Sequence, residues 1–182
     1  MPLVFTTSYT EDARAIFHQY KKLADAAIAQ VSDTNLYCTL DPETNSIAIV
    51  MKHMAGNMLS RWSDFLTTDG EKPTRDRDSE FEDPPATRAE LLTLWERGWS
   101  CLFAALDPLT DADLARTITI RGERHSVMQA INRQVAHYSY HCGQIVFLAK
   151  HLQSSNWKCL SVPRRQSEEF NRKVFAGEAS QR

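Results

Sequence analysis

The sequence lacks the features that mark secreted proteins, membrane-spanning proteins and zinc ribbons. Its four cysteines, at positions 38, 101, 142 and 159, form no Cys-x-x-Cys pair, which argues against a zinc ribbon or a disulfide scaffold. No run approaches the roughly 18 apolar residues of a membrane span, and the first residues lack the basic start of a signal peptide. We therefore expect a reduced, cytoplasmic protein that does not associate with membranes.

An excess of charge of one sign is also missing. The 182 residues contain 21 Lys and Arg against 23 Asp and Glu, which gives a formal net charge of -2. Such a balance offers no overall field to attract nucleic acid. The chain also lacks the Gly-x-Ser-x-Gly motif of serine hydrolases and any phosphate-binding loop. These absences weaken the serine hydrolase, nucleotide-binding and nucleic-acid-binding interpretations, and a chain of this length can bury one core without disulfides.

Helical periodicity dominates the pattern that is present. Apolar residues recur every three or four positions in four stretches, and each stretch opens at a residue that suits a helix N-cap. Asp41 followed by Pro42 marks the start of the second stretch, with Thr44 as an alternative start. We predict an all-α fold, a four-helix bundle with at most one short hairpin before the last helix. The predicted helices cover residues 8–31, 41–66, 87–107 and 126–153.

Three segments lie outside these helices. Residues 117–120 alternate Thr and Ile, and Arg121-Gly122 could turn this run into a hairpin. Residues 67–85 have no period and many charges, which predicts a long solvated connection. We assign residues 1–153 to the bundle. Residues 154–182 are predicted to be a C-terminal tail, with one short helix near residues 166–175, that packs on the bundle or on a dimer partner.

Two of the six histidines stand at helical spacing in the last predicted helix. His137 and His141 are four residues apart, so both rings lie on one face and could grip one ion. At about 100° per residue, they border the apolar stripe of that helix. His53 has the same offset from the apolar stripe of the second helix. Two helices that bury these stripes would present three imidazoles to one groove, with a position open for water or substrate.

The chemistry of such a site follows from its ligands. No Glu-x-x-His occurs on these helices, so a diiron site is not expected, and three imidazoles suit zinc or nickel. A dication there lowers the pKa of a water or thiol toward neutral pH. The sequence offers no obvious general base. Asn57 and Gln144 could bind substrate or orient the ligands, although each could also be a simple surface amide.

Plainer interpretations stand beside this one. The three histidines could be buried and hydrogen-bonded without an ion. Cys142 points too far around the helix to be a good ligand and is expected to be a small buried residue. Met51, Met54 and Met58 are expected to pack in the core. Three tryptophans are expected as core or dimer anchors, and three further histidines as solvated or structural residues: Trp62, Trp95, Trp99, His18, His125 and His151.

One His on the second helix and His-x-x-x-His on the fourth resemble the DinB or YfiT-like superfamily of metal-binding four-helix bundles. The likeness to an uncharacterised branch of that superfamily extends over nearly the whole chain, through residues 61–73, 77–81, 137–145 and 161–171. Arg165 stands where such proteins often have glycine. The resemblance implies nickel or zinc on His53, His137 and His141, and frequently a homodimer.

The resemblance also bears on activity. Characterised relatives include transferases and isomerases that depend on mycothiol, bacillithiol or glutathione. We therefore expect a metal-dependent enzyme that activates a low-molecular-weight thiol, or water, for transfer to an electrophilic small molecule. A metal-dependent hydrolase uses the same ligands. A non-catalytic stress-response or ligand-binding bundle with a structural metal is the third interpretation, which a closed shell of four ligands would favour.

Overall fold

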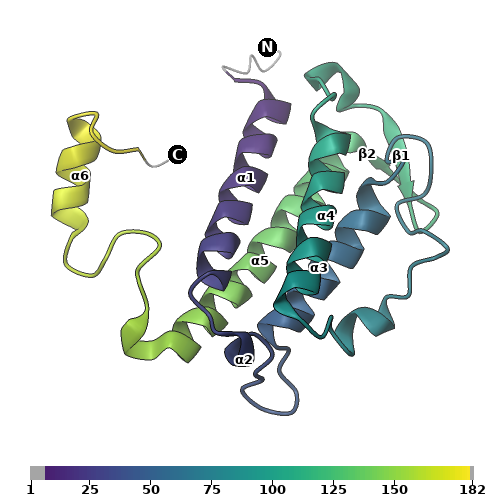
Figure 1. The fold of residues 1–182 in the computed structure, drawn as a ribbon. Coiled ribbons are helices and arrows are strands. Elements are labelled where there is room, and N and C mark those ends of the chain that lie inside the picture. Colours follow the sequence, from purple (N-terminus) through teal and green to yellow (C-terminus); the bar gives the residue numbers. More distant parts are fainter. Residues whose placement is uncertain (1–6, 181–182) are drawn as a thin grey trace.

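A computed structural model describes residues 7–180 of the chain. Residues 1–6 and 181–182, the outer ends of the two predicted segments, lie outside the described residues. The described part is mostly helical, with six α-helices and one two-stranded antiparallel sheet (Figure 1). The elements are α1 (Tyr9–Ile28), α2 (Asp33–Leu36), α3 (Ile47–Trp62), η1 (Asp78–Phe81), α4 (Arg88–Leu106), η2 (Asp111–Asp113), β1 (Thr117–Ile120), β2 (Glu123–Ser126), α5 (Val127–Gln153), η3 (Ser154–Asn156) and α6 (Ser167–Phe175).

The four longest helices pack around one core. α3 lies along α4, and α1 lies along α5 (Figure 1). Gly98 of α4 permits the close approach of α4 to α3, because a Cβ atom at that position would lie 2.9 Å from the Cα of Ala55. The predicted methionine row and the three tryptophans are all buried in this core. α3 therefore has neighbours along most of its length, which fixes any side chain that it carries toward α5.

The sequence placed the start of α3 too early. Asp41 does not begin a helix, because its Oδ1 accepts hydrogen bonds from the backbone N–H groups of Glu43 and Thr44, at 2.9 and 3.0 Å. This local turn competes with helix formation. The N-cap is Ser46, whose Oγ accepts from the N–H of Ile49 at 3.2 Å. The other three predicted N-caps, Ser8, Thr87 and Ser126, all cap the helices expected of them.

The predicted hairpin is present and holds part of the long connection. Arg121 and Gly122 turn it with φ angles of 56° and 76°, and their N–H groups each donate to Asp69 at 2.8 Å. The N–H of Gly70 donates to the carbonyl of Thr119 on β1 at 2.8 Å. The segment before residue 75 is therefore attached to the hairpin, and it leads directly toward η1.

The prediction of a solvated connection over residues 67–85 is wrong for part of that segment. The side chains of Arg75 and Glu80 are only 5% and 6% exposed. Lys52 of α3 fixes η1 in place, because its Nζ donates to the carbonyl of Glu82 at 2.7 Å and also to that of Ser79. The connection thus crosses α3 beside residue 53 and encloses charged side chains instead of exposing them.

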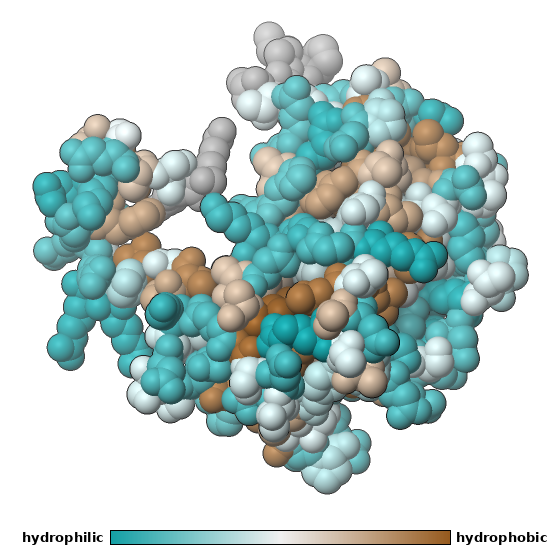
Figure 2. All heavy atoms as spheres, in the orientation of Figure 1, coloured by the Kyte–Doolittle hydropathy of each residue, from teal (hydrophilic) through white to brown (hydrophobic). Residues whose placement is uncertain are grey.

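The C-terminal segment is tied to the bundle at its beginning. Trp157 and Leu160 pack against the core, and the N–H of Lys158 donates to Gln30 of α1 at 2.8 Å. Arg165 adopts a φ of 66°, the left-handed conformation that the expected glycine would favour. α6 itself buries no residue, and Phe175 is 89% exposed. In Figures 1 and 2, α6 stands apart from the bundle, with mostly hydrophilic side chains on its visible surface.

Two truncations separate the contributions of this segment. Removing residues 154–182 is expected to lower the free energy of unfolding by about 1–3 kcal/mol, because Trp157 and Leu160 no longer pack against the core. Removing only residues 167–182 should leave stability unchanged, since α6 buries nothing in one chain. Urea denaturation followed by circular dichroism measures both. A large loss from the shorter truncation at a protein concentration too low for dimers would contradict this view, whereas a loss that appears only at high concentration would indicate that α6 packs against another copy.

Candidate metal centre

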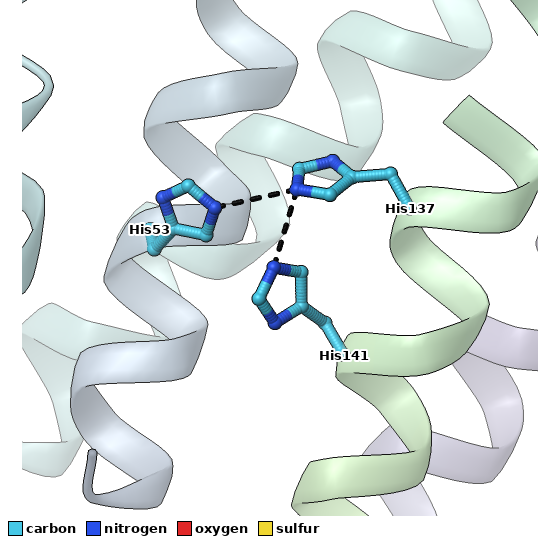
Figure 3. Close-up of side chains that lie close together, drawn as sticks. All are labelled: His53, His137 and His141. Atoms are coloured by element: carbon cyan, nitrogen blue, oxygen red, sulfur yellow. Dashed lines mark hydrogen bonds between the residues drawn. The ribbon is translucent and has the colours of Figure 1, made fainter. Parts of the chain in front are cut away.

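Two helices position the three predicted histidines. His53 lies near the middle of α3, and His137 and His141 lie one turn apart on α5. Figure 3 shows the three rings turned toward one another across the space between these helices. His53 and His141 are buried, and His137 is half-buried. The convergence that the helical offsets predicted is therefore present in the fold.

The distances between the rings are short. The Nε2 of His137 lies 3.3 Å from the Nε2 of His53 and 3.2 Å from the Nε2 of His141. One nitrogen from each of the three rings falls within 4.8 Å of the others. Among the residues that the structure describes, this is the one group of three or more His, Cys, Asp or Glu side chains close enough together to hold a metal ion. The three histidines could therefore hold a metal ion.

The outer nitrogen of each ring faces an oxygen acceptor. The Nδ1 of His53 lies 2.8 Å from Glu80 Oε2, and the Nδ1 of His141 lies 2.8 Å from Gln144 Oε1. The Nδ1 of His137 lies 3.3 Å from Gln134 Oε1. Because each Nδ1–H donates to an oxygen, a neutral ring carries its lone pair on Nε2. All three lone pairs then point into the same small space.

Glu80 is a site residue that the sequence analysis did not identify. Its Oε2 faces His53, and both of its oxygens accept from Arg75, at 2.7 and 2.8 Å. Arg75 in turn reaches Glu71 at 3.3 Å. A bidentate pair of this kind fixes the carboxylate in one orientation. The acceptor for His53 is therefore held by the connection over residues 67–85, not by either helix.

Gly56 explains how Glu80 comes so close to α3. A Cβ atom on residue 56 would lie 2.4 Å from Glu80 Oε1. Glycine in the middle of a helix costs about 1 kcal/mol relative to alanine. At this position it leaves the space in which the carboxylate reaches His53, one turn away along the helix. A mid-helix glycine is the one local signal in the sequence that could have pointed to this contact.

The protein environment shifts the pKa values of these groups. Burial, together with the neighbouring His141 and His53, lowers the pKa of His137 to about 3. Burial also lowers the pKa of His141 to about 4, against the opposing effect of its bond to Gln144. Burial acts to raise the pKa of Glu80, but the hydrogen bonds from His53 and Arg75 outweigh it, so the net shift is downward. The surroundings thus favour uncharged rings at His137 and His141 and a charged carboxylate at Glu80.

The two amides predicted near the site differ in their contacts. Gln144 accepts the hydrogen bond from His141, one of the two roles considered for it. Asn57 is buried and accepts from the hydroxyl of Tyr138 at 2.9 Å, and within residues 7–180 its side chain forms no hydrogen bond with His53. Both side chains line the cavity beside the histidines. Gln134, which contacts His137, was not assigned a role from the sequence.

The remaining candidates lie away from the three rings. His18 is exposed and stacks on Phe103 with 3.9 Å between ring centroids. His151 is exposed, and His125 lies on the hairpin with Glu123 as its charged neighbour at 3.9 Å. Cys142 is buried, and burial raises the pKa of its thiol to about 12. Its thiol is therefore protonated at neutral pH. Its burial agrees with the prediction that Cys142 is a small buried residue.

A cavity of about 380 Å³ opens beside the histidines. Its lining combines the three rings with amides, aromatic side chains and arginines. A volume of this size falls within the range of small-molecule sites.

None of the helices in residues 7–180 combines the length and apolar character that crossing a lipid bilayer requires.

Comparison with known proteins places this fold in a wider group. No curated protein matches the chain significantly. A crystal structure of a conserved protein from Enterococcus faecalis has a similar fold, with a TM-score of 0.62 and 13% sequence identity over 81% of this chain and 98% of that one. At that identity the likeness concerns the fold alone. Residues 4–166 match the family described as protein of unknown function (DUF1572), and the chain belongs to that family.

Proposed function

We propose that His53, His137 and His141 hold a divalent metal ion and that the protein is a metal-dependent enzyme of the DinB-like superfamily. It would activate a small thiol, or water, for transfer to an electrophilic small molecule. The observation that carries this proposal is the convergence of three Nε2 atoms whose outer nitrogens are all engaged by oxygen acceptors. The packing of α1, α3, α4 and α5, with ligands from the second and fourth of these, agrees with the bundle of that superfamily.

The geometry of the donor atoms fits a cation. Ligand atoms at about 2.0 Å from a tetrahedral ion lie about 3.3 Å apart. Two of the Nε2 separations are 3.3 and 3.2 Å. Lone pairs at such distances repel one another when nothing positive lies between them. A cation would satisfy all three at once, and the oxygen acceptors behind the rings are the arrangement usual for metal-binding histidines.

The donor set narrows the choice of metal. Three imidazole nitrogens without a carboxylate or thiolate suit zinc or nickel better than calcium or magnesium. Neither Cys142, which is buried in the core, nor Glu80, which faces the outer nitrogen of His53, belongs to the converging set. Zinc and nickel are therefore the two ions to test first.

The surroundings favour an enzyme over a bundle with a purely structural metal. Three protein ligands would leave a fourth position open on a four-coordinate ion. The three histidines also line the cavity, so a small molecule in the cavity would have access to an ion held there. A bound divalent ion supplies Lewis acidity, which lowers the pKa of a water or thiol that reaches it. Gln144, Gln134 and Glu80 hold the rings, while Asn57 offers a buried amide to a substrate.

The first prediction concerns metal content. The untagged protein should bind one zinc or nickel ion per chain. His137→Ala should weaken that binding by roughly 100-fold or more, because loss of a metal ligand lowers the affinity at least as much as loss of the hydrogen bond behind a ligand. Isothermal titration and elemental analysis measure both. His151→Ala, an exposed histidine on the same helix, is the matched control and should bind normally. Equal metal content in His137→Ala and the unmodified chain would remove the proposal.

A second prediction isolates the carboxylate behind His53. Glu80→Gln should weaken metal binding by about 10- to 100-fold, since the ring loses a charged acceptor. Gly56→Ala should weaken it in the same direction, because the added methyl group displaces Glu80. Glu82→Gln, at an exposed position two residues further along, should have no effect. Unchanged affinity in both Glu80→Gln and Gly56→Ala would show that this contact does not support the ligand.

A third prediction separates the two chemistries. With chlorodinitrobenzene and a small thiol, turnover should require both added metal and thiol: a carbon–sulfur bond forms, the carbon–chlorine bond breaks, chloride leaves and the thiol proton passes to buffer. Absorbance of the thioether product measures the rate. Release of dinitrophenol at a rate that does not depend on the thiol concentration would favour the hydrolase instead.

The homodimer implied by the resemblance forms part of this proposal. The exposed α6, with Phe175 on its surface, is the segment of residues 154–182 that a second chain would cover. The proposal also keeps the division of the chain into a bundle, residues 1–153, and a C-terminal tail, residues 154–182. This division coincides with the end of α5 at Gln153.

A further inference from the structure

The cavity beside the histidines carries a concentration of positive charge. Five arginines contribute to its lining, and within residues 7–180 no aspartate or glutamate does. The chain as a whole has a formal net charge of -2, so this charge is local. Charges gathered in a concave site act more strongly on a ligand than the same charges on an open surface. We call them the cavity arginines: Arg61, Arg75, Arg77, Arg121 and Arg133.

Three cavity arginines are partly neutralised by carboxylates outside the cavity lining. Glu71 pairs with Arg61 at 2.9 Å, with Arg121 at 3.0 Å and with Arg75 at 3.3 Å. Glu80 pairs with Arg75 at 2.7 Å. Two carboxylates thus serve three guanidinium groups. The Nε of the buried Arg61 has no hydrogen-bond partner among the described residues. This inner group keeps a net positive charge while it supports the wall of the cavity.

The other two cavity arginines are available to a ligand. Arg133 is exposed on α5, one turn before His137, and forms no ion pair with any described residue. Arg77 is 52% exposed, and its neighbour Asp78 lies 3.9 Å away and is itself 95% exposed, so the pair is weak. The guanidinium of Arg77 lies over the ring of Phe81, 5.1 Å from its centre. The ring thus supports the side chain, whose N–H groups form no hydrogen bond with any residue in the described range 7–180.

We infer that the cavity takes a small molecule with an oxyanion group, a carboxylate or a phosphoryl group, bound by Arg77 and Arg133. Guanidinium groups bind both kinds of oxyanion in a bidentate manner. The oxyanion would hold one end of the molecule, and the other end would lie toward the three histidines. The inference deepens the proposed function where it concerns the reacting end, whereas the anion site rests on the arginines alone.

Anion binding can be measured without any metal. Isothermal titration of the metal-free protein at low salt would use inorganic phosphate and propionate as probes, with propionamide as the neutral control. We expect at least one of the two anions to bind and propionamide not to bind. Arg77→Gln and Arg133→Gln should each weaken binding by about 5-fold, the upper range for one exposed ion pair. Arg97→Gln, another exposed arginine without an ion pair among the described residues, lines a different cavity and should change nothing.

The outcomes distinguish the anion site from the proposed metal site. Tighter binding of phosphate assigns a phosphoryl group to the ligand, and tighter binding of propionate assigns a carboxylate. Anions that bind no better than propionamide overturn the inference, as do Arg77→Gln and Arg133→Gln variants that match Arg97→Gln. When the chain binds metal but not anions, only this inference fails. When it binds anions through these arginines but not zinc or nickel, only the proposed metal site fails.

Discussion

Three lone pairs held toward one point are the constraint on which the rest of this site depends. Neutral imidazoles left free would rotate apart, and here each ring is prevented from doing so by an oxygen behind it. Two of these oxygens come from α5 itself, three residues from the histidine that each one holds. The third comes from Glu80, which is distant in sequence. The rigidity of the packed helices and the position of η1 are therefore both needed to keep the rings convergent.

The helices and the histidines were accessible from sequence because both follow local periodicity. The N-caps Ser8, Thr87 and Ser126 and the hairpin turn at Arg121 are short-range features, and the structure contains all of them. The same rule failed at Asp41, where a side chain that can cap a helix instead closes a turn. A pattern of residue types does not specify which of the two hydrogen-bonding arrangements, the turn or the helix cap, is formed at such a residue.

The contact between Glu80 and His53 was out of reach for a different reason. A segment crowded with charges is normally solvated, and nothing in residues 67–85 taken alone distinguishes Arg75 and Glu80 from their neighbours. Their burial depends on where the connection is attached, at the hairpin through Asp69 and at α3 through Lys52. Such attachments join residues far apart in the chain, so they follow from the fold and not from periodicity.

Glu80 also links the two properties of the cavity. Its charge orients His53, and the same charge offsets part of the field of Arg75. Without that carboxylate, the lining would be more positive but the ring behind it would be less fixed, so metal binding and anion binding would move in opposite directions. The carboxylate is therefore placed where it limits the field without lining the cavity. A site arranged in this way keeps accessible positive charge on the exposed Arg77 and Arg133 and its ring nitrogens on the less exposed histidines.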